Sequence, residues 1–179
     1  MKTALLALAL VVLVPFAVTA DDTLASFNGG IAVSTPLIAV TVTGVEPNIS
    51  VTPVLNIVCG VSPGGVPWRI RNLHAVVEAS GHITVEGRGL LLAGGSPTLP
   101  ALDVIGTNGG QMVKAELFCN TSLSACGTAH TSGLVSLEAD GDFKIDDTLS
   151  PSVPPTCTKP VLLITNGAPR WFAAGIPKK

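Results

Sequence analysis

The chain contains no tyrosine, and only 12% of its 179 residues are charged. The flat side chains on which sugars stack are therefore scarce, and we expect Trp68 and Trp171 to pack in the core or at strand ends. Ten Lys and Arg residues are scattered among twelve Asp and Glu residues, so there is no basic patch of the kind that binds nucleic acid. We expect no nucleic-acid partner.

Several catalytic motifs are absent as well. The sequence contains no phosphate-binding glycine loop, no His-Glu-x-x-His and no Cys-x-x-Cys. Ser62 lies in a Gly-x-Ser-x-Gly match, but Pro63 has no N–H to offer an oxyanion and no helical pattern follows it. A turn is the better interpretation of this segment. No residue pattern in the chain names an activity.

The first twenty residues have the pattern of a signal peptide. Lys2 precedes an apolar stretch from Ala4 to Val14, and small residues at Val18-Thr19-Ala20 suit cleavage. The stretch is too short to span a bilayer. Cleavage after Ala20 would remove one Lys and leave nine basic against twelve acidic residues, a charge of about −3. Residues 21–179 then form the mature protein, which we expect to be secreted or periplasmic, without a membrane span.

An exported chain with four cysteines is expected to form two disulfides. Three connectivities are compatible with four cysteines. Cys119 ends one apolar run and Cys157 precedes another, which favours a bridge between neighbouring strand ends. We predict Cys119–Cys157 together with Cys59–Cys126.

Short apolar runs separated by Gly, Pro, Asn and Ser predict an all-β chain. We expect a single disulfide-stapled domain, a β-sandwich or β-barrel of about eight or nine strands. Thr148–Thr158, with three prolines, is predicted to be a loop. The expected strands are Leu37–Val45, Val51–Cys59, Trp68–Glu78, His82–Leu92, Met112–Cys119, Gly133–Glu138, Asp142–Asp147, Val161–Thr165 and Trp171–Ile176.

Two turns predict hairpins of known register. A three-residue loop at Ala79-Ser80-Gly81 alternates apolar and polar residues cleanly between two faces, which a two-residue loop would not. The same loop at Ala139-Asp140-Gly141 would place Val135 and Leu137 against Ile145 and Phe143. The first register predicts the opposed pairs Val77 with Ile83, Ala75 with Val85, His74 with Glu86, and Glu78 with His82.

Both polar faces carry candidate site residues. Glu138, Asp140 and Asp142 would lie close together, and a calcium ion would relieve their repulsion; a solvated acidic turn is the alternative. The spacing does not match an EF-hand because Lys144 stands at a ligand position. No other cofactor is expected.

The four residues His74, Glu78, His82 and Glu86 form two His–Glu pairs, about 13 Å apart along the strands. We interpret them as surface pairs, with acid–base catalysis as the alternative.

Two functional hypotheses follow. The favoured one is an exported, non-enzymatic β domain that acts as a binding, adhesive or envelope component, with a protein or glycan partner and with contacts on glycine-rich loops such as Asn28-Gly29-Gly30. The alternative is a small exported hydrolase or lyase that uses the His and Glu pairs, or a site completed by His130. A concave pocket in which two of these groups converge would favour the enzyme.

Overall fold

The computed structural model describes residues 22–94, 104–122 and 125–178, and the signal peptide predicted at 1–20 lies outside these residues. The described chain is all-β and contains no α-helix. Its strands are β1 (Thr23–Ala32), β2 (Leu37–Thr43), β3 (Ser50–Leu55), β4 (Ser62–Pro63), β5 (Trp68–Arg69), β6 (Asn72–Glu78), β7 (His82–Arg88), β8 (Leu91–Leu92), β9 (Met112–Phe118), β10 (Ala129–Thr131), β11 (Val135–Ser136), β12 (Phe143–Thr148), β13 (Val161–Thr165) and β14 (Arg170–Pro177).

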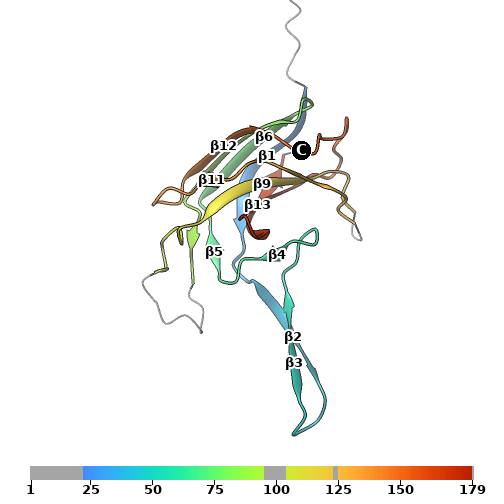
Figure 1. Cartoon of the computed structure of the whole chain (residues 1–179), viewed down its shortest axis with the longest axis vertical. Coiled ribbons are helices and arrows are strands. Elements are labelled where there is room, and N and C mark those ends of the chain that lie inside the picture. The colour runs from blue at the N-terminus through green and yellow to red at the C-terminus, as the bar shows by residue number, and fades with distance from the viewer. Residues whose placement is uncertain (1–21, 95–103, 123–124, 179) are drawn as a thin grey trace, which may run out of the picture.

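One curled, mainly antiparallel sheet forms the body of the molecule (Figure 1). Its strand order is β10-β9-β13-β14-β1-β6-β7-β12, with β11 added to β9 and β4 added in parallel to β14. Thr131 of β10 and Ser150, just after β12, exchange two backbone hydrogen bonds of 2.8 and 2.9 Å. The curl therefore brings the two ends of the sheet together. This half-barrel confirms the predicted all-β class.

The central strand β1 was not predicted. We expected Asn28-Gly29-Gly30 to form a glycine-rich contact loop, and this expectation is wrong. The segment is a bulge inside β1, where the register to β14 shifts between Phe27 and Gly30. Gly29 has a φ of +90°, and a Cβ on Gly30 would lie 2.9 Å from the Leu73 Cβ. Glycine is required here because the backbone bends and closely approaches β6.

The hydrophobic core lies inside the curl. Strands β6 and β7 direct alternate residues inward, including Leu73, Val77, Ile83 and Val85, all of them fully buried. Strand β13 differs because Leu162, Leu163 and Ile164 are all fully buried. This continuous burial shows that β13 is covered on both faces, as expected of a run without polar alternation.

A second layer covers the outer face of β13 and β14. The Trp68 ring stacks on Phe172 with centroids 4.1 Å apart, and the Trp171 Nε1–H donates a 2.9 Å hydrogen bond to the Asn56 carbonyl oxygen. Both tryptophans are buried. The expectation that they pack in the core is confirmed, and neither is a platform for a sugar.

Both predicted disulfides are present. Cys119 pairs with Cys157 and Cys59 pairs with Cys126, at Cα–Cα distances of 4.7 and 5.1 Å. The first joins the end of β9 to the segment that precedes β13, two strands paired in the sheet. The second ties the segment after β3 to the loop before β10. Such bridges are typical of extracellular proteins.

The strands differ from the prediction mainly where the chain bends. Two predicted strands, Trp68–Glu78 and His82–Leu92, are each divided, because their outer ends pair separately as β5 and β8. Val161–Thr165 is observed as predicted, and Thr148–Thr158 is loop beyond the end of β12. In the described residues, no helix has the length and apolar character needed to cross a membrane.

Removing one disulfide should cost substantial stability. The Cys119–Cys157 bridge closes a separation of 38 residues, so the double variant Cys119→Ala/Cys157→Ala should lower the free energy of unfolding by about 4 kcal/mol, as chain entropy predicts. Denaturant unfolding measures this loss. The corresponding Cys59/Cys126 variant, at a separation of 67, should lose a similar amount because loop entropy grows only logarithmically. Losses below about 1 kcal/mol in both would contradict a stapling role.

Candidate functional site

The predicted His and Glu residues lie on the outer face of the β6–β7 hairpin. The observed register pairs Val77 with Ile83, Ala75 with Val85 and His74 with Glu86, as predicted. Gly81 has a φ of +87°, and its N–H donates to the Glu78 carbonyl, which closes the expected three-residue loop. Because the inward positions are apolar and buried, the His and Glu side chains face away from the core.

His82 is held between two carboxylates. Its Nδ1 lies 3.4 Å from Glu78 Oε1, and its Nε2 lies 2.9 Å from Asp146 Oδ1. Glu78 was predicted as a partner, whereas Asp146 was not, since β12 pairs with β7 from far along the chain. The hydrogen bond with Asp146, followed by that with Glu78, raises the pKa of His82 above 6.5.

The other predicted acid–base residues do not join this group. His74 and Glu86 are exposed and oppose each other across the ladder. His130 lies on β10, buried, with Nδ1 2.8 Å from the Pro151 carbonyl oxygen, in the wall of a separate cavity of about 680 Å³. Among the described residues lining that cavity, His130 is the only titratable side chain. The predicted acid–base residues therefore lie in two separate regions, with His130 on β10 and the others on the β6–β7 hairpin.

The acidic turn also closes as predicted, but its strands diverge. Gly141 has a φ of +82°, and the Glu138 N–H donates to the Asp142 carbonyl oxygen. The expected ladder between Val135–Leu137 and Phe143–Ile145 does not form, because β11 pairs with β9 and β12 pairs with β7. Both short strands therefore pair with strands that are remote in sequence and not with each other.

Two arginines approach one carboxylate of the acidic turn. The Asp142 carboxylate lies 3.5 Å from Arg71 Nη2 and 3.9 Å from Arg88 Nη1, and it accepts a 2.8 Å hydrogen bond from the Gly89 N–H. Asp140 accepts a hydrogen bond from the Asp142 N–H. Over residues 22–94, 104–122 and 125–178, no group of three His, Cys, Asp or Glu side chains is placed to hold a metal ion. Of the three carboxylates predicted to share a calcium ion, Asp142 instead faces cations of the chain itself.

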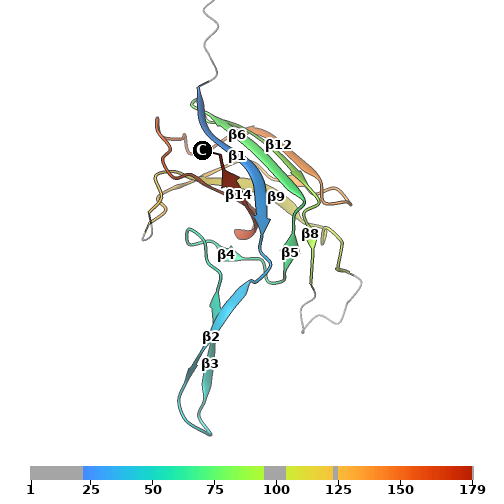
Figure 2. The ribbon, with the colours of Figure 1, turned by 180° about the vertical axis from the view of Figure 1, so that it is seen from behind.

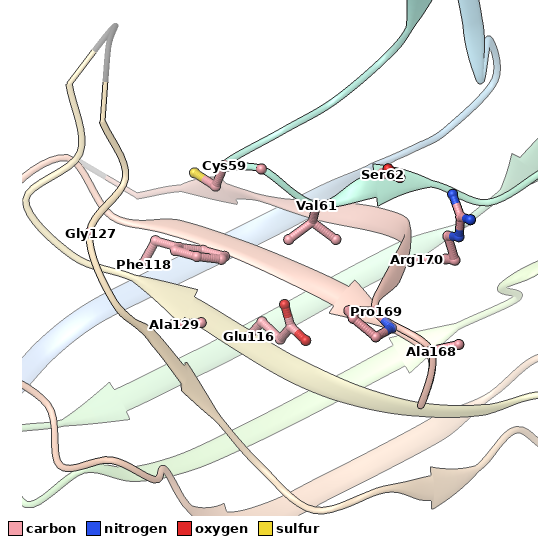
Figure 3. A pocket seen from close by; sticks show the side chains of 11 residues that line it. Cys59, Val61, Ser62, Glu116, Phe118, Gly127, Ala129, Ala168, Pro169 and Arg170 are labelled. Atoms are coloured by element: carbon pink, nitrogen blue, oxygen red, sulfur yellow. The ribbon is translucent and has the colours of Figure 1, made fainter.

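A buried glutamate was missed by the sequence analysis. Glu116 lies on the outer face of β9, only 3% exposed, and borders a cavity of about 470 Å³ (Figure 3). Its carboxylate oxygen Oε1 lies 2.9 Å from Lys114 Nζ and accepts a 3.0 Å hydrogen bond from the Thr165 hydroxyl. Figure 3 places Val61 on the opposite wall and Ser62 beside Arg170 at the rim. The available signal was Lys114 and Glu116 at a spacing of two, inside an otherwise apolar strand.

The serine at this cavity does not stand in a nucleophile elbow. Ser62, the serine of the Gly-x-Ser-x-Gly match, begins β4 and pairs in parallel with Arg170, with no helix after it. Among the described residues that line the cavity there is no histidine to activate a serine. The buried carboxylate is neutralised by Lys114.

The β2–β3 hairpin projects away from the body (Figures 1 and 2). Every residue from Leu37 to Leu55 is exposed, and none belongs to the hydrophobic core. Val42 is 59% exposed and Val45, near the tip, is 81% exposed. The strands form their own two-stranded sheet. The sequence analysis predicted both strands but expected them inside a folded sheet.

The two faces of the hairpin differ in chemistry. The register opposes Val40 to Pro53 and Val42 to Val51 on one face, and it opposes Thr41 to Thr52 and Thr43 to Ser50 on the other. Leu37 opposes Leu55 at the base. We call Leu37, Val40, Val42, Val51, Pro53 and Leu55 the aliphatic face, and Thr41, Thr43, Ser50 and Thr52 the hydroxyl face.

Comparisons with known proteins add no relative: no protein-family model, no curated sequence and no solved structure matches the chain. The functional argument therefore depends on the geometry of the described residues.

The buried pair Lys114–Glu116 generates a stability prediction. Glu116→Gln removes the negative charge and leaves the Lys114 ammonium, whose side chain is 19% exposed, without its counter-charge. We expect the free energy of unfolding to fall by about 3 kcal/mol, measured by denaturant unfolding. The double variant Lys114→Met/Glu116→Leu should recover most of this loss because it removes both charges. A double variant no more stable than Glu116→Gln would contradict the ion-pair explanation.

His82 generates a pH prediction. Because the folded state raises its pKa, the stabilisation is complete below pH 6.5 and disappears as pH rises through the folded pKa. Asp146→Asn should therefore lower the melting temperature more at pH 5 than at pH 8.5. His82→Gln should remove the same pH-dependent difference. An Asp146→Asn effect of equal size at both pH values would show that the contact does not depend on charge.

Proposed function

We propose that the protein is an exported, non-enzymatic β domain that acts as a binding, adhesive or envelope component, and that the β2–β3 hairpin is its contact element. The observation that carries this proposal is an exposed aliphatic face on an element that contributes nothing to the core. Large apolar patches on exposed surfaces mark interaction sites. The partner is a protein or glycan surface outside the cytoplasm.

The rest of the fold supports a scaffold role. Two disulfides tie loops to the sheet, and Cys59 lies four residues after β3, so one bridge anchors the base of the hairpin. The backbone N–H of Asn56 donates to the Pro36 carbonyl oxygen at 2.9 Å, which closes that base. A rigid base beneath an exposed element suits binding, because the element then loses less conformational entropy when it associates with a partner.

The alternative is a small exported hydrolase or lyase. Glu78, His82 and Asp146 form its best centre, since a histidine between two carboxylates could transfer protons. These side chains stand on an outward sheet face, and Asp146 is 58% exposed. A catalytic histidine normally works inside a water-excluding pocket. The geometry therefore favours binding over catalysis.

Replacing the hairpin tests the proposal. Residues 37–55 are exchanged for Asn-Gly, a two-residue turn that can join the adjacent Pro36 and Asn56. We expect the variant to keep the melting temperature of the parent because the core is untouched. It should lose most of its retention on isolated envelopes and extracellular polymer of the producing cells, measured with fluorescently labelled protein.

His82→Gln serves as the control for the enzymatic alternative, since it leaves the hairpin intact and should bind like the parent. Equal retention of the hairpin-replaced and parent proteins would contradict the proposal. Turnover of ester, peptide or glycoside substrates that His82→Gln abolishes would establish the alternative.

A further inference from the structure

The aliphatic face of the β2–β3 hairpin needs a partner. The inference about which partner covers it rests on the proposed function. We propose that the occupant is a second copy of the chain: two hairpins pack with their aliphatic faces together, antiparallel, about a two-fold axis. The protein would thus associate with itself through these arms.

The size of the exposed surface calls for a partner. Five large aliphatic residues of the aliphatic face, Leu37, Val40, Val42, Val51 and Leu55, are 36–59% exposed. At about half exposure they leave on the order of 300 Å² of apolar surface in water. That is at the lower end of the range for the largest patch on a typical monomer. It is well below the roughly 800 Å² per partner of a standard interface, so at most a weak, micromolar dimer is expected. Further exposed aliphatic residues lie outside the register of this face, at Ile38, Val45, Ile49, Val54 and Ile57.

The division between the two faces indicates one-sided contact. Strand periodicity places valines and leucines on the aliphatic face, while the opposite face carries Thr41, Thr43, Ser50 and Thr52 and, toward the base, the pair Ala39–Val54. Hydroxyl groups on a sheet face can stay hydrated, whereas the aliphatic face gains from leaving water. A single layer of partner is therefore enough.

The charge of the hairpin permits an identical partner. Between Thr23 and Trp68, Glu46 at the tip of the hairpin is the only charged residue. Two uncharged aliphatic faces can be superposed without burying a charge, and a two-fold interface requires only that one surface complement itself. The antiparallel arrangement places the two Glu46 carboxylates at opposite ends, about 20 Å apart for strands of seven residues. At that distance solvent ions screen their repulsion.

A lipid bilayer is a poorer occupant. Within the described residues β2 and β3 pair only with each other, so each strand leaves one edge of N–H and C=O groups unpaired. Hydrocarbon cannot satisfy these groups. Insertion would also carry Glu46 into the bilayer first, at a cost of about 2.5 kcal/mol or more. Packing two hairpins face to face in water leaves those edges hydrated.

Matched substitutions on neighbouring residues of β2 test the proposal. The disulfide-bonded exported protein is studied by sedimentation velocity from about 1 to 200 μM, a range chosen around a micromolar dimer. Val42→Glu places a charge in the aliphatic face, and Thr41→Glu places the same charge on the hydroxyl face. Both positions are exposed, so neither change should alter the melting temperature.

We expect the parent to dimerise, Val42→Glu to weaken dimerisation by about a hundredfold, and Thr41→Glu to change it by less than about threefold. The hairpin-replaced protein should be monomeric. A parent that stays monomeric at 200 μM overturns the second-copy proposal, and so does a dimer that Val42→Glu leaves intact or that Thr41→Glu weakens equally.

A flotation assay with phosphatidylcholine–phosphatidylglycerol vesicles distinguishes failure of the second-copy proposal from failure of the proposed function. A monomeric parent that floats with vesicles, while Val42→Glu does not, overturns the second-copy proposal but leaves the hairpin as a contact element. A monomeric parent that binds neither vesicles nor envelope material overturns both proposals. Dimerisation together with retention on envelopes supports both.

Discussion

The curled sheet depends on one strand, β1, which joins β6 to β14. Its first part pairs with β6 and its second part pairs with β14. Without it the sheet would separate into β10-β9-β13-β14 and β6-β7-β12. The junction requires close contact: a Cβ on Gly175 would lie 3.0 Å from Phe27 Cδ1, just as one on Gly30 would crowd Leu73. The absence of side chains at these glycines lets three strands meet around the fully buried Phe27.

The body and the hairpin differ in how they place apolar residues. In the body, the strands of the core bury apolar residues on one or both faces, and charged side chains such as Arg71, Asp142 and Asp146 find partners at the surface. In the hairpin, apolar residues are exposed and neither β2 nor β3 carries a charged residue. Natural edge strands usually carry devices that prevent edge pairing. Of these, the hairpin has Pro53 and the register shift between Leu37 and Ala39, but no charge within its strands.

The polar groups that suggested chemistry from sequence stabilise the outer surface. His82 links β6, β7 and β12 through Glu78 and Asp146, and Asp142 links the acidic turn to Arg71 and Arg88. Asp147 also stabilises this surface. The N–H groups of Gly133 and Thr148 donate hydrogen bonds to its carboxylate and lower its pKa. The contacts of His82 with Asp146, of Asp142 with Arg71 and Arg88, and of Asp147 with Gly133 each join segments that are separated in the chain.

The sequence by itself determined the strand class and the β6–β7 register, and among three possible disulfide connectivities it favoured the one that is observed. These depend on local alternation, on a three-residue turn with glycine, and on cysteines at the ends of apolar runs. It did not reveal β1, because Gly29 and Gly30 signal a loop until a neighbouring backbone explains them. Nor could it separate β11 from β12, since the winning partners β9 and β7 are remote in sequence.

Only the tertiary structure decided which apolar strands would be buried. Leu37–Thr43 and Val161–Thr165 both read as apolar strands, yet the first is exposed throughout and the second is buried. Alternation states which residues share a face, but it contains no information about what covers that face. The same reason hid Glu116, which is buried and whose hydroxyl partner Thr165 comes from a distant strand, β13. Whether a residue is buried depends on the residues that surround it, and the whole fold determines which residues those are.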